Sequence, residues 1–325
     1  MKADKMKILV NLCRFIVAIT FIFSGFVKLV DPLGSAYKFE QYFGYDVLNL
    51  EFLIPYALPF SILLILAEIM LGVMLLMGYL PKLTTWSLLL MILIFLFLTW
   101  YSAYFDKVTD CGCFGDAIKL SAWGTFYKNI VLVILILVLV IQSKAIKPLL
   151  SLTIAKWTSF LMFLVFLYII YYVLVHLPII DFRPYAVGKN IPDGMEYVGE
   201  EEPSIHDFFL ESAEGEDLTS HVLTEDNVLL VVVSNLSKSN KEGFFKIKPI
   251  TDLALQKGYT VYALTSSVME DYTSIKNEFK LNFEMLFCDE ITLKTIIRAN
   301  PGILTLQKGT VTGKWSWTDS DAIKL

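Results

Sequence analysis

The chain has 325 residues, of which 56% are hydrophobic and 18% are charged, and its mean hydropathy is +0.61. This composition excludes an ordinary soluble protein, and the length exceeds that of one small domain. Residues 1–180 hold 13 Lys and Arg against 9 Asp and Glu, whereas residues 181–325 hold 14 against 23. The sequence therefore predicts a membrane part followed by an acidic soluble part, whose charge argues against binding to nucleic acid or to anionic lipid.

Five apolar segments are long enough to cross the bilayer as helices. They cover about residues 8–30, 56–80, 84–104, 123–141 and 157–177. The basic residues before the first segment would also suit a signal peptide, but no small-residue cleavage site follows it. The segment 31–51 mixes aromatic and charged residues with proline and glycine, and we expect it to lie at the membrane interface.

Basic residues near the ends of the spans predict the orientation of the chain in the membrane. With the N-terminus in the cytoplasm, eight basic residues lie at the inner ends and five at the outer ends. The loop after the third span and the C-terminal domain then both lie outside, in a compartment where disulfides persist. We expect a multi-pass protein of the cell (inner) membrane with an extracytoplasmic C-terminal domain.

Two cysteines, Cys111 and Cys113, flank Gly112 in the short polar loop between the third and fourth spans. A tight turn at a glycine can bring such thiols within the disulfide window, with Cα atoms about 4.4–6.8 Å apart. So small a ring would be strained, and strained disulfides are the labile ones. A redox pair is the favoured interpretation. A structural staple stays open, as does a metal site, for which the three histidines are distant in sequence.

Polar residues inside the apolar spans are the other candidates. Glu68 is an intramembrane carboxylate and therefore a functional candidate, and Lys28 is its natural partner. Glu68 either holds helices together or relays protons beside a thiol or quinone site. Asn129 is expected to hydrogen-bond another helix. Trp123 suits an interface anchor or, alternatively, a cofactor contact.

The acidic tail shows a regular pattern after an irregular linker over residues 181–217. Strands are expected over residues 228–233, 259–264 and 283–287, helices over 242–256, 269–280 and 290–298, and a hairpin over 303–307 and 310–315. This order predicts an α/β domain over residues 218–325, with parallel and antiparallel strands in one sheet.

Three stretches resemble the signatures of the DoxX and MauE membrane proteins: Phe23–Pro32, Ala67–Gly72, and Asp110–Asp116 with the later Trp123, Lys128 and Asn129. The resemblance covers about residues 7–143. It implies a four-helix transmembrane bundle over residues 1–148, to which this chain adds a fifth span within 149–180. It also implies a thiol or sulfur redox role, linked in these families to quinone and, for MauE, to maturing a disulfide-rich periplasmic subunit in methylamine utilisation.

The tail in turn resembles a thioredoxin-like domain, in which the proline before the hairpin is cis, so Pro301 is expected to be cis. Thioredoxins carry their redox cysteines after the first central strand, where this chain has Ser234–Asn240 and no cysteine. Cys288 is expected to be a small buried residue. The tail is therefore interpreted as a redox-inactive binding module for a client, or as a structural domain.

These features favour a thiol–disulfide oxidoreductase at the extracytoplasmic face, with disulfide formation or sulfur-compound oxidation linked to quinone and with a periplasmic thiol protein as client. The expected catalytic residues are Cys111, Cys113 and Glu68. Quinone binding or proton relay is expected at Lys28, Trp123 and Asn129, and no metal is expected. The alternatives are a non-catalytic assembly factor or scaffold that anchors the thioredoxin-like domain, and a small-molecule transporter.

Overall fold

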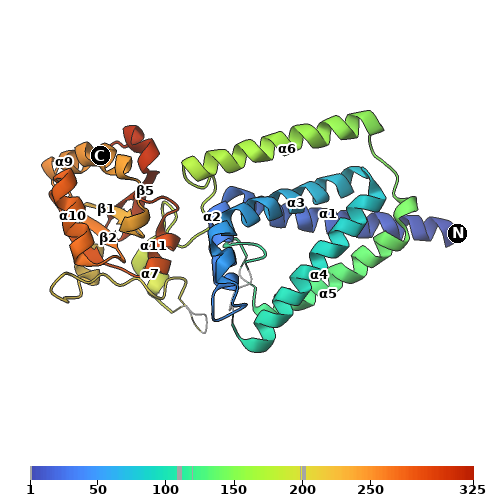
Figure 1. The fold of residues 1–325 in the computed structure, drawn as a ribbon, viewed down its shortest axis with the longest axis horizontal. Helices are drawn as coiled ribbons and strands as arrows, with labels where there is room; N and C mark the ends of the chain where they lie inside the picture. Colours follow the sequence, from blue (N-terminus) through green and yellow to red (C-terminus); the bar gives the residue numbers. More distant parts are fainter. Residues whose placement is uncertain (1, 108–111, 119, 198, 200–202) are drawn as a thin grey trace. The chain divides into compact units, whose positions relative to one another are not determined.

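The protein is described by a computed structural model covering residues 2–107, 112–118, 120–197, 199 and 203–325 (Figure 1). It divides into two compact units, Met1–Val173 and Leu174–Leu325. The first unit is helical and the second is built around a mixed sheet.

Within the described residues, five helices are long and apolar enough to cross a membrane. They are α1 (Lys2–Val30), α3 (Ala57–Met77), α4 (Pro81–Phe105), α5 (Ala122–Ile141) and α6 (Leu152–Val175). The five expected spans are confirmed, and the chain is a multi-pass membrane protein. The expected interfacial segment forms α2 (Pro32–Phe43), which begins with a proline in its first turn and with Asp31 accepting a hydrogen bond from the Gly34 N–H, followed by the 3₁₀ helix η1 (Glu51–Tyr56).

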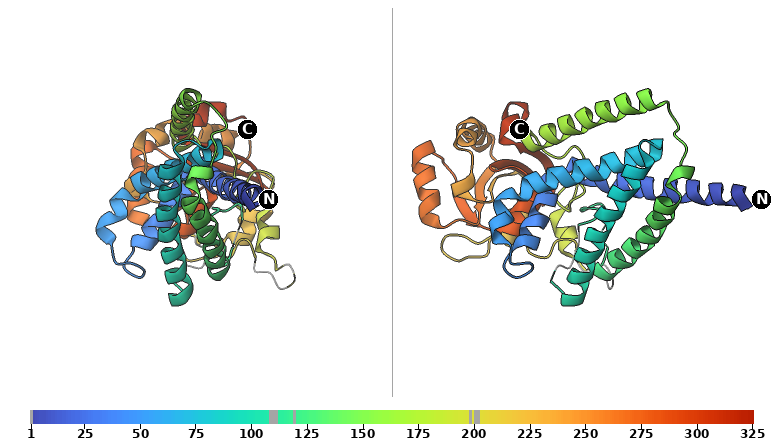
Figure 2. Two further views of the ribbon diagram at one scale, coloured as in Figure 1. Left: turned by 90° about the vertical axis from the view of Figure 1, so that its right-hand side faces the viewer. Right: turned by 45° about the vertical axis from the view of Figure 1, so that its right-hand side comes forward.

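Helix α1 packs along α3, and α4 packs along α5 (Figures 1 and 2). Apolar side chains from all four helices form one core around Val17, Leu75, Leu88 and Ile136. In contrast, α6 buries only Ala155, Ser159, Ile170 and Val173. A helix that is apolar on every side and exposes most of its residues suits a lipid environment.

One end of the bundle is held by a buried arginine. Arg14 donates from Nε to the Leu75 carbonyl at 2.9 Å and from Nη2 to the Leu76 carbonyl at 2.7 Å. Its Nη1 donates to the Lys147 carbonyl at 2.9 Å. The Leu75 and Leu76 carbonyls lie in the last turn of α3, where carbonyls lack the N–H four residues on that pairs them inside a helix. Arg14 thus links the end of α3 to the connection between α5 and α6.

The second unit contains a five-stranded sheet in the order β3-β2-β1-β4-β5. Its strands are β1 (Val228–Val233), β2 (Thr260–Thr265), β3 (Glu284–Phe287), β4 (Gly302–Gln307) and β5 (Thr310–Ser316). The first three are parallel, and β4 is antiparallel to both β1 and β5. The expected mixed sheet is confirmed, and its order, with two strand–helix–strand crossovers and a final hairpin, is thioredoxin-like.

Helices cover both faces of this sheet (Figure 1). Val228, Leu230 and Val232 of β1 join one core with α8 (Thr219–Thr224) and α11 (Glu290–Ile296), together with the short α7 (Ile191–Met195). The alternate residues of β1 join a second core with α9 (Lys241–Gln256) and α10 (Met269–Phe279). Burial on both faces explains why β1 is a continuous run of apolar residues.

The segment before α7 runs along the edge strand β5. The Gly188 N–H donates to the Val311 carbonyl at 2.8 Å, and the Val311 N–H donates to the Lys189 carbonyl at 2.9 Å. These bonds use backbone groups that an open edge would leave free. Residues 181–217, expected as an irregular linker, also supply apolar side chains to the core of the domain: Tyr185, Ile191, Ile205, Phe208 and Leu210.

A buried lysine on β5 predicts a pH-dependent stability of this domain. Lys314 Nζ lies 2.6 Å from Asp181 Oδ2, and its side chain is only 4% exposed. Burial lowers the pKa of Lys314 from 10.5 to about 7, and the nearby positive charges of Arg183 and Arg298 act in the same direction. The attraction of Asp181 raises the pKa but does not offset these effects. Because the unfolded chain binds the Lys314 proton more tightly, this lysine should make stability rise by roughly 1 kcal/mol per pH unit between about pH 7 and about pH 9, above which ionisation of buried thiol and phenol groups in the unfolded chain opposes the rise.

Hydrogen exchange of the β4–β5 amides, corrected for intrinsic rates, measures this slope in the full chain. Lys314→Met should flatten it. Lys308→Met serves as the control, because Lys308 is exposed at the hairpin turn, and should keep the slope. A slope that persists in Lys314→Met would show that another group titrates.

Candidate functional site

A buried ion pair lies in the first unit between α1 and α3. Lys28 Nζ is 3.0 Å from Glu68 Oε2, and the two residues are only 6% and 2% exposed. The expected partnership of Lys28 with Glu68 is therefore present. Ionisable groups inside membrane spans are costly, so a paired set of this kind marks a candidate functional site.

The two helices approach closely because small residues lie at their contact. A Cβ atom on Gly25 would lie 2.8 Å from the Ile69 Cβ, and Gly72 makes a similarly close contact with α1. Small residues at such contacts let helix backbones approach in membranes. A larger residue at position 25 would force α1 away from α3 and would separate Lys28 from Glu68.

The Lys28 ammonium also holds the cysteine loop. Nζ donates to the Cys113 carbonyl at 2.7 Å and to Ser24 Oγ at 2.7 Å, in addition to Glu68. The Ser24 hydroxyl donates to the same Cys113 carbonyl at 2.5 Å. An ammonium has three N–H groups, and these three partners use all of them. In this arrangement Lys28 positions Cys113, with no donor left for a further ligand.

The turn that follows is fixed by two glycines and a phenylalanine. Gly112 and Gly115 have φ values of 63° and 49°, which favour glycine, and the Gly115 N–H donates to the Gly112 carbonyl at 3.1 Å. The Phe114 ring lies 5.5 Å from the ring of Phe23, and Lys128 Nζ lies 4.3 Å from its centroid. The turn is thereby attached to both α1 and α5.

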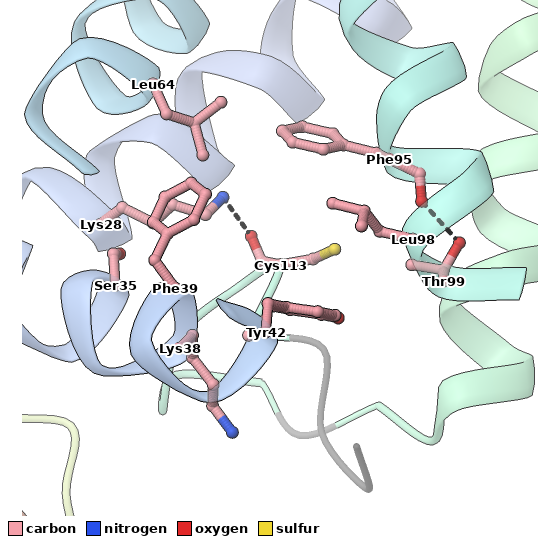
Figure 3. Close-up of a pocket in the computed structure, with 11 residues that line it drawn as sticks. Lys28, Ser35, Lys38, Phe39, Tyr42, Leu64, Phe95, Leu98, Thr99 and Cys113 are labelled. Atoms are coloured by element: carbon pink, nitrogen blue, oxygen red, sulfur yellow. Dashed lines mark hydrogen bonds between the residues drawn. The ribbon is translucent and has the colours of Figure 1, made fainter. Parts of the chain in front are cut away.

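Cys113 is partly buried, and its thiol has no disulfide partner among the described residues. In Figure 3 its sulfur points away from Lys28, toward Leu98 and Thr99 of α4. Cys111 lies outside the described residues, so the pairing of the two thiols stays a prediction.

The Cys113 side chain lines a cavity of about 60 Å³ whose walls are largely apolar (Figure 3). Helix α2 contributes one wall and α4 the facing one, and the lining includes Phe39, Tyr42, Leu64, Phe95 and Leu98. Apolar and aromatic walls with a few polar groups are typical of sites for small apolar ligands.

The part that α2 plays in this wall was not predicted. Its amphipathic character indicated only an interfacial helix. The spacing of Lys38, Phe39 and Tyr42 places the three on one helix face, and this was the available signal. The Tyr42 hydroxyl lies 3.1 Å from Ser102 Oγ, a hydrogen bond that attaches α2 to α4.

The remaining predicted positions differ in their placement. Asn129 Nδ2 donates to Thr99 Oγ1 at 3.2 Å, so the expected bond to another helix is confirmed. Trp123 is 45% exposed, packs against Phe126, and is not among the residues that line the Cys113 cavity. The structure thus gathers the described site residues around Cys113 with the exception of Trp123.

In the second unit, the loop after β1 is closed by polar contacts. Asn300 Nδ2 donates to the Asn235 carbonyl at 2.9 Å, and the Asn240 N–H donates to the Asn300 carbonyl at 3.1 Å. The Asn300–Pro301 bond is cis, as expected. This loop occupies the place of the thioredoxin cysteines and carries none.

Cys288 does not replace them. It is fully buried, and burial together with the charge of Asp289 raises the pKa of its thiol to about 12. Such a thiol stays protonated at neutral pH and is a poor nucleophile. Cys288 therefore acts as a small core residue, as the sequence suggested.

The fold and these contacts define a multi-pass membrane protein that carries a thioredoxin-like domain without redox cysteines. Residues 6–142 match the family described as Methylamine utilisation protein MauE. The expected resemblance is thus confirmed for the four-span part of the chain. No curated protein matches the sequence significantly.

Solved structures give two similarities. The thioredoxin domain of a thiol-disulfide oxidoreductase from Bacteroides vulgatus is 15% identical, with a TM-score of 0.29, over 40% of this chain and 87% of that one. A thioredoxin-like protein from Bacteroides caccae is 15% identical, with a TM-score of 0.30, over 86% of this chain and 85% of that one. The thioredoxin-like assignment itself rests on the strand order and connections of the second unit.

Proposed function

We propose that the chain is a membrane thiol–disulfide oxidoreductase whose reactive pair is Cys111 and Cys113. The observation that carries the proposal is the setting of Cys113: a thiol, fixed through its residue's carbonyl by a buried ion pair, at the wall of an apolar cavity. A cysteine that only pins a loop would need neither the intramembrane charges nor the cavity.

The oxidant in this proposal is a membrane quinone. Oxidation of the two thiols forms one S–S bond and releases two electrons and two protons, and the quinone takes up both pairs to become a quinol. Glu68 accepts and passes on thiol protons as a general base. The dithiol of a client protein then reduces the disulfide and leaves with a disulfide of its own. The apolar and aromatic lining of the cavity supports a quinone ring as the occupant.

We place this site, with the C-terminal domain, at the extracytoplasmic face of the inner membrane. The bias of basic residues toward the other face supports this orientation, and client disulfides persist only in an oxidising compartment. The thioredoxin-like domain binds the client in this scheme and takes no electrons, because its β1–α9 loop has no cysteine.

A second candidate, a non-catalytic assembly factor or scaffold, is favoured by the same loop. The bonds among Asn235, Asn240 and Asn300 close the place where thioredoxins react. In this alternative the bundle only anchors the domain, and the Cys111–Cys113 pair keeps one redox state.

Filling the cavity tests the quinone site. Leu98→Trp should slow single-turnover oxidation of the reduced protein by a short-chain benzoquinone in proteoliposomes by about tenfold or more, because overpacking of the cavity excludes the ring. Leu90→Trp is the control, since Leu90 is 65% exposed on the same helix. Equal oxidation rates in both variants would remove the quinone from this cavity.

A further inference from the structure

Asn129 carries a buried acceptor with no hydrogen-bond partner. The residue is 1% exposed, and its Oδ1 is unpaired among the described residues. Its Nδ2 must be the group that faces Thr99, because the Thr99 hydroxyl already donates to the Phe95 carbonyl at 2.8 Å. Buried polar atoms in proteins almost always find a partner, and ordered water is the usual one when protein groups do not reach.

A small cavity of about 10 Å³ adjoins Asn129. A space of this size holds about one water molecule. Its lining includes Glu68, Ser24, Lys128 and Cys113. The cavity is thus lined by two residues that can accept a hydrogen bond from a water, Asn129 and Glu68, and by Cys113.

The cavity also lies on the path that the proposed chemistry requires. Cys113 lines both this small cavity and the larger one, whereas Glu68 lines only the small one of the two. Cys113 as a residue therefore borders both the space proposed for the electron acceptor and a space shared with the proton acceptor.

We infer that one water molecule, held by Asn129 Oδ1 and the Glu68 carboxylate, carries the proton of the Cys113 thiol to Glu68. The S–H bond breaks as an O–H bond forms on the water, and the water passes one of its own protons to the carboxylate. Water is conserved, and one negative charge moves from the carboxylate to the sulfur. The inference rests on the proposed function, because it is the redox cycle that requires the Cys113 thiol to lose its proton. Asn129 acts as a positioning residue for the water.

The water itself is tested by a structure of the full chain in nanodiscs, at a resolution that shows ordered waters elsewhere in the bundle. We expect solvent density about 3 Å from both Asn129 Oδ1 and the Glu68 carboxylate. Side chains placed as described here with no density between them would overturn the inference. This result does not depend on whether the cysteines turn over.

The role of the water is tested by quinone oxidation of the reduced protein. Asn129→Leu removes the acceptor and should slow the oxidation at saturating quinone by about tenfold. This is less than the whole contribution that proton transfer usually makes to a rate, because Glu68 remains in place. Asn129→Asp keeps an oxygen and should restore most of the rate. Thr125→Val is the control, since Thr125 is buried on the same helix but is not among the residues that line the cavity.

The solvent isotope effect separates proton transfer from structural damage. In wild type the oxidation should be slower in D₂O, and the size of this effect should change in Asn129→Leu and not in Thr125→Val. An unchanged rate and isotope effect in Asn129→Leu would overturn the role. If wild type itself is never oxidised by quinone, the proposed function and this relay both fail, while the density experiment still decides the presence of the water.

Discussion

Replacing Lys28 with methionine is expected to destabilise the four-helix part by about 3–5 kcal/mol, because Glu68 is left buried without its counter-charge. Both groups are almost fully buried, so solvent cannot take the place of the ammonium. Glu68→Leu should also lower the stability, because it leaves the Lys28 ammonium buried without its counter-charge. The double variant Lys28→Met/Glu68→Leu removes both charges and should recover most of the stability. Thermal unfolding in detergent measures these losses of stability. A loss in the double variant equal to the sum of the losses in the two single variants would contradict the expected compensation.

The same double variant separates stability from function. It should fold, yet it lacks both the ammonium that holds the Cys113 carbonyl and the carboxylate proposed as the base, so oxidation of the thiol pair should be strongly impaired. Ser24→Ala is the graded comparison, because it removes one of the two side-chain donors to that carbonyl and leaves the Lys28–Glu68 pair in place. An intermediate oxidation rate is expected for Ser24→Ala. Wild-type oxidation in the double variant would show that neither the Lys28 contact to the Cys113 carbonyl nor the Glu68 carboxylate takes part in the chemistry.

Cys111→Ser is expected to abolish quinone-linked oxidation and to accumulate mixed disulfides between Cys113 and the client. A single remaining thiol can be joined to a client cysteine, but the internal disulfide can no longer form to continue the cycle. Non-reducing electrophoresis of the tagged protein followed by mass spectrometry identifies the partner and the linked residue.

Two buried cysteines provide matched controls for this trap. Cys13 and Cys288 are buried thiols away from the loop, so Cys13→Ser and Cys288→Ser should leave both oxidation and trapping unchanged. Adducts formed through either of them, or continued turnover in Cys111→Ser, would disprove the assignment of the pair.

Much of the fold could be predicted because full burial, in the membrane or in a covered sheet, leaves continuous apolar runs in the sequence. The five spans are apolar over their full length, and β1 was predicted over its exact residues, Val228–Val233, because both faces of the strand are covered. The place of residues 181–217 in the domain was harder to foresee. The side chains that they add to the core, such as Tyr185 and Phe208, follow no helical or strand period.

The site was predictable in its parts and not in its assembly. Glu68 and Lys28 stood out because charges are rare within spans. The clamp on the Cys113 carbonyl could not be foreseen, because it depends on the depth at which the loop returns toward α1. The cavity wall supplied by α2 likewise depends on how that helix packs against α4. Such contacts join residues far apart in sequence, and no local pattern encodes them.

The central claim is that Cys111 and Cys113 change redox state with the quinone pool. The direct test is to trap the thiols in intact membranes with an alkylating mass tag, before and after quinone depletion and again after quinone is restored. We expect a disulfide in replete membranes, accumulation of the tagged dithiol on depletion, and return of the disulfide on restoration. A pair that keeps one state under all three conditions would contradict it.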